Sequence, residues 1–264
     1  MSEAARSGTQ VPAGLYARDI QLSYGGLKVL KGVSISIERG QITGIVGPNG
    51  AGKSSLFNVL AGNAAPDHGR VCLGSQDITR LAVHDRARAG IARTFQLARE
   101  LDSLTVLENL LLAWPDQAGD TLWRTFLQRD GIRKTQEQAV EHALALLERT
   151  RLTRLADSQA GGLSGGQKKL LELCRALMLN APIILLDEPA AGVNPALMDE
   201  LAGFISELRD EGKTFAVVEH NMDLIATLCD TVYVLADGAV LTQGTFAEVV
   251  ADSRVQDAYL GVTL

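Results

Sequence analysis

The chain has 264 residues, of which 46% are hydrophobic and 21% are charged, a mix that is typical of globular domains and disfavours disorder. Its formal net charge of −6 disfavours a nucleic-acid partner, because such partners usually select a basic surface. No run approaches the roughly 18 apolar residues of a membrane-spanning helix. Residues 1–14 are small and polar without the apolar core of a signal peptide, so we expect a flexible N-terminal tail.

The first structured segment alternates apolar and polar residues. Ala17–Ile37 does so on both sides of a turn at Tyr24–Gly26, which predicts an antiparallel hairpin. Gln41–Val46 then reads as a short buried strand, and it leads into a glycine-rich loop. A helix is predicted after that loop, from Lys53 to about Gly62.

The middle of the chain, residues 97–180, has a helical character. Thr105 and Glu108 have the spacing of a capping box before an apolar run. Gln136–Arg149 carries its apolar residues at helical spacing. Trp114–Lys134 lies between these segments, and we expect an irregular insertion there. The pattern predicts a helical subdomain.

The C-terminal part alternates between strands and helices. Apolar, β-branched runs at Ile183–Asp187, Thr214–Glu219 and Thr231–Leu235 predict three strands. Pro195–Arg209 and Met222–Leu228 lie between them and have helical patterns. This alternation predicts an α/β fold with a mostly parallel sheet that is flanked by helices on both faces.

The glycine-rich loop matches the phosphate-binding pattern G-x-x-x-x-G-K-S, with a strand before it and a helix after it. Glycines let backbone N–H groups turn toward phosphates, and the positive end of the helix dipole favours the same anion. Lys53 would contact the β- and γ-phosphates, and the Ser54 hydroxyl would bind Mg²⁺. The predicted phosphate-binding residues are Gly47, Pro48, Asn49, Gly50, Ala51, Gly52, Lys53, Ser54 and Ser55.

Two adjacent carboxylates end the strand Ile183–Asp187. Ligands of parallel sheets bind beyond the carboxyl ends of the strands, so Asp187 and Glu188 should lie beside the phosphate loop. Neighbouring residues on a strand point in opposite directions, so the two acids should have different roles. We predict Asp187 as a Mg²⁺ residue and Glu188 as the general base that polarises the attacking water.

A second helix start has the features of an anion site. Ser164 and Gln167 have capping-box spacing, and two glycines lie between them. Composition alone favours an ordinary capped helix with a glycine hinge. A second phosphate site in a chain that already has one makes sense only if it serves another nucleotide.

The motif LSGGQ, between the phosphate loop and the Asp187-Glu188 strand, resembles the signature of the ABC ATPase family. The resemblance covers Leu15–Leu264 and implies a P-loop NTPase core, made of residues 15–96 and 181–264, with an N-terminal antiparallel β subdomain and the helical subdomain inserted. It also implies that two subunits pair head to tail, so that the signature of one contacts the γ-phosphate bound by the other. The signature residues are Leu163, Ser164, Gly165, Gly166 and Gln167.

The resemblance assigns further positions. Tyr24 is similar to the aromatic residue that stacks on adenine, and Gln96 to the glutamine that senses Mg²⁺ and the attacking water. His220 resembles the switch histidine that contacts the γ-phosphate. Gly192 and Asn194 fall in the segment that crosses the dimer. Asn194 stands where the family often has aspartate, and asparagine keeps the hydrogen bonds without the charge.

Several segments resemble one branch of the family, the ATPases of branched-chain amino-acid importers and their relatives for urea and amides. These segments are Arg93–Gln96, Thr105–Leu110, Ala190–Pro195 and Ala258–Gly261. The ATPase of lipopolysaccharide exporters shares several of them and is the alternative. A non-transport ABC protein acting on nucleic acid or ribosomes should have two cassettes or a long heptad insertion, and the sequence has neither.

The resemblance implies ATP and Mg²⁺ as ligands. It implies a second ATPase subunit (identical or paralogous), permease subunits and a periplasmic or extracellular substrate-binding protein as partners. The expected location is cytoplasmic, on the inner face of the membrane. The transported substrate does not follow from these residues, because this subunit never contacts it.

Overall fold

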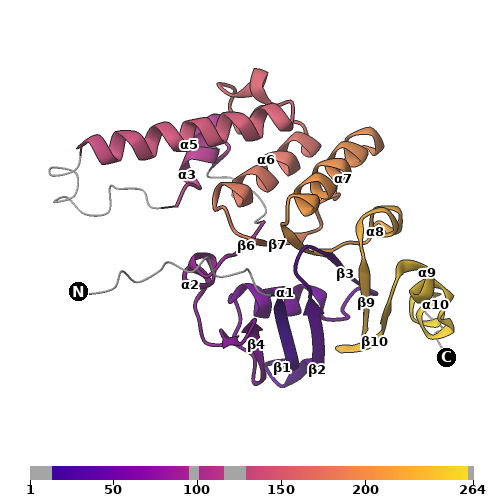
Figure 1. The fold of residues 1–264 in the computed structure, drawn as a ribbon. Helices are drawn as coiled ribbons and strands as arrows, with labels where there is room; N and C mark the ends of the chain where they lie inside the picture. Colours follow the sequence, from indigo (N-terminus) through magenta and orange to yellow (C-terminus); the bar gives the residue numbers. More distant parts are fainter. Residues whose placement is uncertain (1–13, 95–100, 116–128, 261–264) are drawn as a thin grey trace, which may run out of the picture.

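The computed structural model describes residues 14–94, 101–115 and 129–260 (Figure 1). Its main sheet has six strands and confirms the predicted α/β class with a mostly parallel sheet. The strand order is β10 (Ala239–Gly244), β9 (Thr231–Ala236), β3 (Ile42–Val46), β8 (Thr214–Val218), β7 (Ile183–Asp187) and β6 (Ile91–Arg93). All neighbours pair in parallel except β9 and β10.

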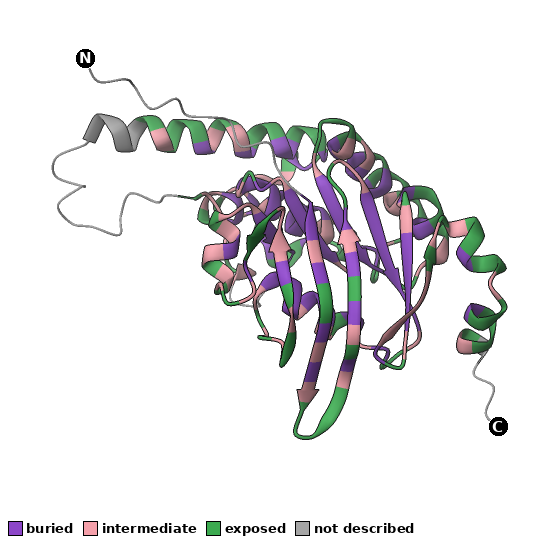
Figure 2. Ribbon diagram, turned by 60° about the horizontal axis from the view of Figure 1, so that its bottom comes forward, coloured by how far each residue is buried: buried purple, intermediate pink, exposed green. Residues whose placement is uncertain are grey.

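A second, antiparallel sheet contains the predicted hairpin. Its order is β2 (Leu27–Ile37), β1 (Leu15–Tyr24), β4 (His68–Leu73) and β5 (Gln76–Asp77). Gly25 and Gly26 form the hairpin turn with φ of 54° and 89°, a conformation that glycine adopts readily. The central strands β3 and β8 of the main sheet are buried along their whole length, while β1 and β2 alternate between buried and more exposed residues (Figure 2).

Alternate residues of the main strands face two different cores. Ile183 and Leu185 pack with α1 (Lys53–Ala61) and the antiparallel sheet. Ile184 and Leu186 face the opposite way and pack with a group of helices. Those helices are α3 (Val106–Leu112), α5 (Arg129–Arg149), α6 (Gly165–Met178), α7 (Pro195–Asp210) and part of α8 (Met222–Leu228). Figure 1 shows α3, α5 and α6 on the far side of the main sheet from β1 and β2.

The remaining helices are short. Helix α2 (Val83–Arg88) precedes β6, and α9 (Phe246–Ala251) and α10 (Ser253–Leu260) follow β10. Two 3₁₀ turns, Thr153–Leu155 and Ala160–Gly162, join α5 to α6. Among the described residues, no helix combines the length and apolar character needed to cross a bilayer.

The predicted irregular insertion at Trp114–Lys134 is wrong at its C-terminal end, because α5 begins at Arg129. The first turns of this helix, Arg129–Lys134, are mostly polar and extend the helix predicted at Gln136–Arg149 toward the N-terminus. Extending a formed helix adds one hydrogen bond per residue and is much easier than nucleating it. That gain outweighs the cost of Gly131, about 1 kcal/mol. Residues 116–128 of the insertion lie outside the described residues.

Two predicted capping boxes are confirmed. At α3, Thr105 Oγ1 accepts a hydrogen bond from the Glu108 N–H at 3.1 Å. Oε2 of Glu108 in turn accepts one from the Thr105 N–H at 2.7 Å. At α6, Ser164 and Gln167 make the same reciprocal pair. Local side-chain bonds of this kind satisfy N–H groups that have no partner inside a helix.

The C-terminal end of α1 is held by Arg86, which is 1% exposed. Its guanidinium donates to the carbonyls of Val59 at 2.5 Å and Leu60 at 2.7 Å, and to Thr79 at 2.9 Å. The last carbonyls of a helix lack partners within it and carry partial negative charge, so a buried cation is stabilised there.

Candidate functional site

The strand order brings several of the predicted site residues to one edge of the main sheet. Strands β3, β8, β7 and β6 are consecutive neighbours and run parallel. Strand β3 is followed by Gly47–Ser55, a loop whose last three residues form the start of α1. Strand β8 leads to Glu219 and His220, and β7 ends at Asp187 and Glu188. The carboxyl ends of parallel strands form the usual ligand-binding edge of such sheets.

The loop after β3 depends on glycine at two positions. Gly47 has a φ of 148°, and a Cβ there would lie 2.1 Å from the carbonyl oxygen of Leu235. Gly52 has a φ of 98°, and its Cβ would lie 2.7 Å from a methyl carbon of Leu30. A side chain at either position would displace the loop from the neighbouring strands.

Lys53, the first residue of α1, is buried against this loop. Its Nζ donates to the carbonyl of Gly47 at 2.8 Å and to that of Pro48 at 3.0 Å. Burial lowers the pKa of Lys53, and the negative charge of Glu188 partly opposes this shift. Asn49, Gly50 and Ser54 are exposed, so the loop presents its backbone and the Ser54 hydroxyl to solvent around a fixed cation.

Asp187 is paired with an arginine that the sequence analysis missed. Nη2 of Arg93 lies 2.7 Å from Oδ2 of Asp187, and Nη1 donates to Oδ1 of Asn58 at 2.7 Å. Among the described residues, Oδ1 of Asp187 has no hydrogen-bond partner. This free carboxylate oxygen and the exposed hydroxyl of Ser54 are the hard oxygen donors that Mg²⁺ prefers beside phosphates. The residues therefore fit a magnesium ion.

Glu188 and His220 contact each other. Nε2 of His220 lies 3.2 Å from Oε1 of Glu188, and the two side chains are 45% and 42% exposed. Glu188 has a φ of 48°, in the left-handed region that non-glycine residues rarely adopt. This backbone conformation at the end of β7 is of the kind that concentrates at functional sites.

Glu219 is a second residue that the sequence analysis missed. It was predicted as the last residue of a strand, but β8 ends at Val218 and the Glu219 side chain turns inward to 3% exposure. Its oxygens accept from the N–H groups of Ala190 at 2.7 Å, His220 at 2.8 Å and Asn221 at 3.1 Å. A carboxylate directly after four buried apolar residues, Phe215–Val218, is the signal that could have indicated this burial.

The LSGGQ segment lies at the start of α6. Ser164 and Gly165 are exposed, while Leu163 and Gly166 are buried. A Cβ on Gly166 would lie 2.0 Å from a methyl carbon of Leu197, so this glycine also lets α6 pack closely on α7. A Cβ on Gly165 would lie 3.2 Å from the carbonyl oxygen of Gly192, which places the signature beside the loop after Glu188.

The other predicted site residues are in varied positions. Tyr24 ends β1 at the hairpin and is 50% exposed. Gly192 is exposed with a φ of 74°. Asn194 caps α7, its Oδ1 accepting from the Leu197 N–H at 2.9 Å. Gln96 lies outside the described residues. The structure thus brings together the loop at Gly47–Ser55 and the ends of β7 and β8.

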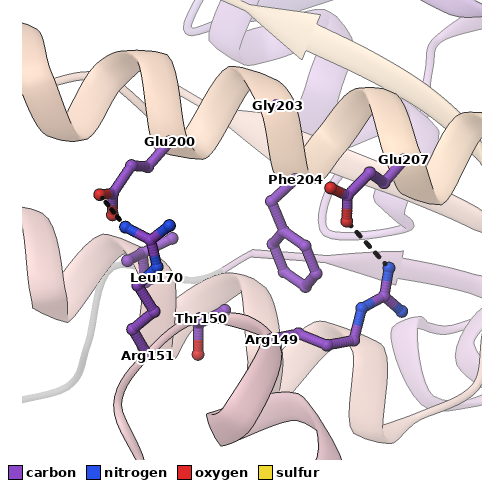
Figure 3. Close-up of a pocket in the computed structure, with 8 residues that line it drawn as sticks. All are labelled: Arg149, Thr150, Arg151, Leu170, Glu200, Gly203, Phe204 and Glu207. Carbon is purple, nitrogen blue, oxygen red and sulfur yellow. Dashed lines mark hydrogen bonds and ion pairs between the residues drawn. The ribbon is translucent and has the colours of Figure 1, made fainter.

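A separate hollow lies between α5, α6 and α7 (Figure 3). Arg151 pairs with Glu200 at 2.8 Å, and Arg149 pairs with Glu207 at 3.5 Å and lies over the ring of Phe204. Its lining residues are Arg149, Thr150, Arg151, Leu170, Glu200, Gly203, Phe204 and Glu207. The charges in this hollow already pair with each other, so it offers no equivalent of the Lys53 cradle.

Comparison with known proteins decides the family. The family model described as ABC transporter matches residues 30–191. The chain belongs to this family. A second model, described as branched-chain amino acid ATP-binding cassette transporter, matches residues 239–263 of this ABC subunit.

Relatives match the ABC subunit over nearly its whole length. A probable branched-chain amino acid transport ATP-binding protein LivG from Archaeoglobus fulgidus is 40% identical, covering 94% of this chain and 95% of the relative. The high-affinity branched-chain amino acid transport ATP-binding protein BraF from Pseudomonas aeruginosa is 37% identical, covering 92% and 95%. A solved nucleotide-free ATP-binding cassette from an ABC transporter has a TM-score of 0.83 at 39% identity, covering 94% and 98%.

These matches confirm the family predicted from LSGGQ and the predicted fold. The chain is an ATP-binding and ATP-hydrolysing subunit of an ABC transporter, and membership of the family implies permease subunits as partners. A related cassette at 39% identity was solved in an ADP conformation, with a TM-score of 0.82.

Proposed function

We propose that this subunit hydrolyses ATP to drive the import of branched-chain amino acids or related small solutes, such as urea and amides. The names of the relatives and the match at residues 239–263 support this branch over the lipopolysaccharide exporter. Separate permease subunits would form the path of the solute across the membrane, and a substrate-binding protein would deliver the solute to them. The subunit would act on the inner face of the membrane.

ATP would bind at the Gly47–Ser55 loop. Lys53, at the start of α1, is already a buried cation that donates to two carbonyls of the loop, and it would exchange these for phosphate oxygens. Tyr24, half exposed at the hairpin end, would stack on the adenine. Ser54, Gln96 and Asp187 would hold Mg²⁺, which when bound would neutralise charge on the phosphate oxygens.

Hydrolysis would take place between the loop and the end of β7. Glu188 would polarise the attacking water, and His220 would orient Glu188 and contact the γ-phosphate. The observation that carries this assignment is the 3.2 Å contact between His220 Nε2 and Glu188 Oε1 at the carboxyl edge of the sheet. Both side chains keep enough exposure to reach a substrate.

Two subunits would close head to tail around ATP. Ser164 and Gly165 are exposed at the N-terminus of α6, where the helix dipole favours an anion. The signature of one subunit would contact the γ-phosphate in the other, and the Gly192–Asn194 segment would cross the interface. Residues 15–96 and 181–264 would form the nucleotide-binding core, and residues 97–180 the helical subdomain that passes closure to the permease.

Reconstitution with the permease subunits tests this function. The complex in proteoliposomes should take up leucine only with ATP and the substrate-binding protein. Lipopolysaccharide extraction without amino-acid uptake would instead support the exporter. For the pairing of subunits, Ser164→Arg should prevent ATP-driven dimerisation in size-exclusion chromatography. Intact dimerisation of that variant would exclude the trans role of the signature.

A further inference from the structure

Glu219 is a buried carboxylate whose charge is balanced by the backbone. Its side chain is 3% exposed, and it forms no ion pair within the part of the chain that the structure describes. Three N–H groups point at its two oxygens instead. Hydrogen bonds from N–H groups to a carboxylate are short and strong, and burial of the charge without them would be costly. The carboxylate therefore fixes whichever segments supply those N–H groups.

These N–H groups belong to the two loops that carry the reactive pair. Oε1 of Glu219 binds the N–H of Ala190, two residues after Glu188. Oε2 binds the N–H of His220 at 2.8 Å and that of Asn221 at 3.1 Å. One carboxylate thus bridges the segment after β7 and the turn after β8.

The sheet itself holds these loops only as far as Glu188. The Glu188 N–H donates to the carbonyl of Val218 at 2.9 Å, which is the last bond of the β7–β8 ladder. The side chains of Glu188 and His220 are half exposed and are joined by a single contact. An exposed contact of that kind is worth little energy and does not fix two loops. The buried bridge at Glu219 supplies the missing constraint.

We propose that Glu219 is a positioning residue for ATP hydrolysis, which holds the Glu188 and His220 loops at the separation their contact requires. This inference rests on the proposed roles of Glu188 and His220. Ala190 also begins the segment proposed to cross the dimer. The bridge would therefore tie that segment to the His220 turn, so that subunit closure and the reactive geometry are set together.

Glu219→Gln tests the bridge with little change in shape. Glutamine has one oxygen and one NH₂ group, so its NH₂ must face either the Ala190 N–H or the two N–H groups of the His220 turn. Two donors at under about 3 Å repel, and one loop has to move. A displacement of about 1 Å near reacting groups can cost about 100-fold in rate. We expect kcat to fall about 10- to 100-fold, with ATP affinity within about threefold of wild type.

Glu248→Gln is the matched control. Glu248 also accepts a backbone N–H, that of Thr245 at 2.8 Å, but it does so in the capping box of α9. The kcat of the Glu248→Gln variant should stay at the wild-type value. Should Glu219→Gln fail to fold, Glu219→Asp replaces it. Aspartate keeps the charge but is one methylene shorter, so it cannot reach both loops, and the same loss of kcat is expected.

A double-mutant cycle with His220→Ala separates positioning from a merely structural role. If Glu219 acts through the pair, Glu219→Gln should cost less than about threefold in kcat once His220 is absent. An equal loss in both backgrounds, or a wild-type kcat for Glu219→Gln, would overturn the inference. A wild-type kcat for His220→Ala alone would instead contradict the proposed function.

Discussion

Strands β7 and β8 are neighbours and end at the same edge of the sheet, yet their carboxylates have opposite surroundings. Glu188, after β7, is 42% exposed and has one side-chain hydrogen-bond partner among the residues that the structure describes. Glu219, after β8, is 3% exposed and accepts three backbone N–H groups. A group that must meet substrate keeps most of its hydrogen-bonding capacity unused, whereas a group that holds the site has most of that capacity occupied. Substitutions at the two ends should therefore differ in what they damage.

The largest effect is expected for His220→Ala. Removing the imidazole leaves Glu188 without its side-chain partner and the γ-phosphate without a contact. We expect kcat to fall roughly 100- to 10,000-fold, about 3–5 kcal/mol in barrier height. Because His220 is exposed, the urea midpoint of unfolding should stay close to that of wild type. A large loss of stability would contradict the contrast between exposed reactive residues and buried structural ones, since it would show that His220 also stabilises the fold.

Arg86→Met extends the comparison to another buried charge that is hydrogen-bonded to the backbone. The guanidinium donates to carbonyls at the end of α1 that would lose their donor inside the protein. A hydrogen bond of a charged group contributes about 1.5–3 kcal/mol to stability. We therefore expect the free energy of unfolding to fall by about 3 kcal/mol. Urea denaturation with an unchanged m-value measures this loss. An unchanged midpoint would show that burial and hydrogen bonds to the backbone do not identify supporting residues.

Glu219→Gln should lower the free energy of unfolding by about 1–3 kcal/mol, because a buried N–H group is left without an acceptor. The matched change at the exposed end, Glu188→Gln, should stay within about 0.5 kcal/mol of wild type. The two variants are compared by urea denaturation of the nucleotide-free protein. Equal losses of stability would remove the distinction between the strand ends.

The smallest effect concerns pH. Burial lowers the pKa of Lys53, so Lys53 loses its charge at a lower pH than an exposed lysine does. The charged form binds phosphate, so ATP affinity should fall by a few-fold as the pH rises from about 7 to about 10. Nucleotide titrations at each pH measure this fall. In Lys53→Met the dependence should disappear, and the same slope in that variant would assign it to other groups.

The parts of the fold and site that could be predicted depend on short stretches of sequence. The loop at Gly47–Ser54 turns through glycines with positive φ, and the caps at Thr105 and Ser164 involve residues three positions apart. Asp187 and Glu188 follow an apolar run that reads directly as a buried strand. In each case the deciding interactions lie within one element and its flanks.

The parts that were missed depend on distant residues. Glu219 acquires its partner Ala190, and Arg93 its partner Asp187, only because β6, β7 and β8 are adjacent in the sheet. No local pattern states that adjacency. The early start of α5 was missed for a different reason, since its first turns at Arg129–Lys134 are polar and contain a glycine, and the following apolar turns extend the helix through them.

The most direct test of the account is Glu188→Gln, with ATP binding and hydrolysis measured on the same purified protein. Glutamine keeps the shape of the side chain but cannot take a proton from water. The account predicts wild-type ATP affinity and ATP-driven dimerisation, with hydrolysis reduced at least about 100-fold. Turnover close to the wild-type rate would contradict the assignment of Glu188 as the base.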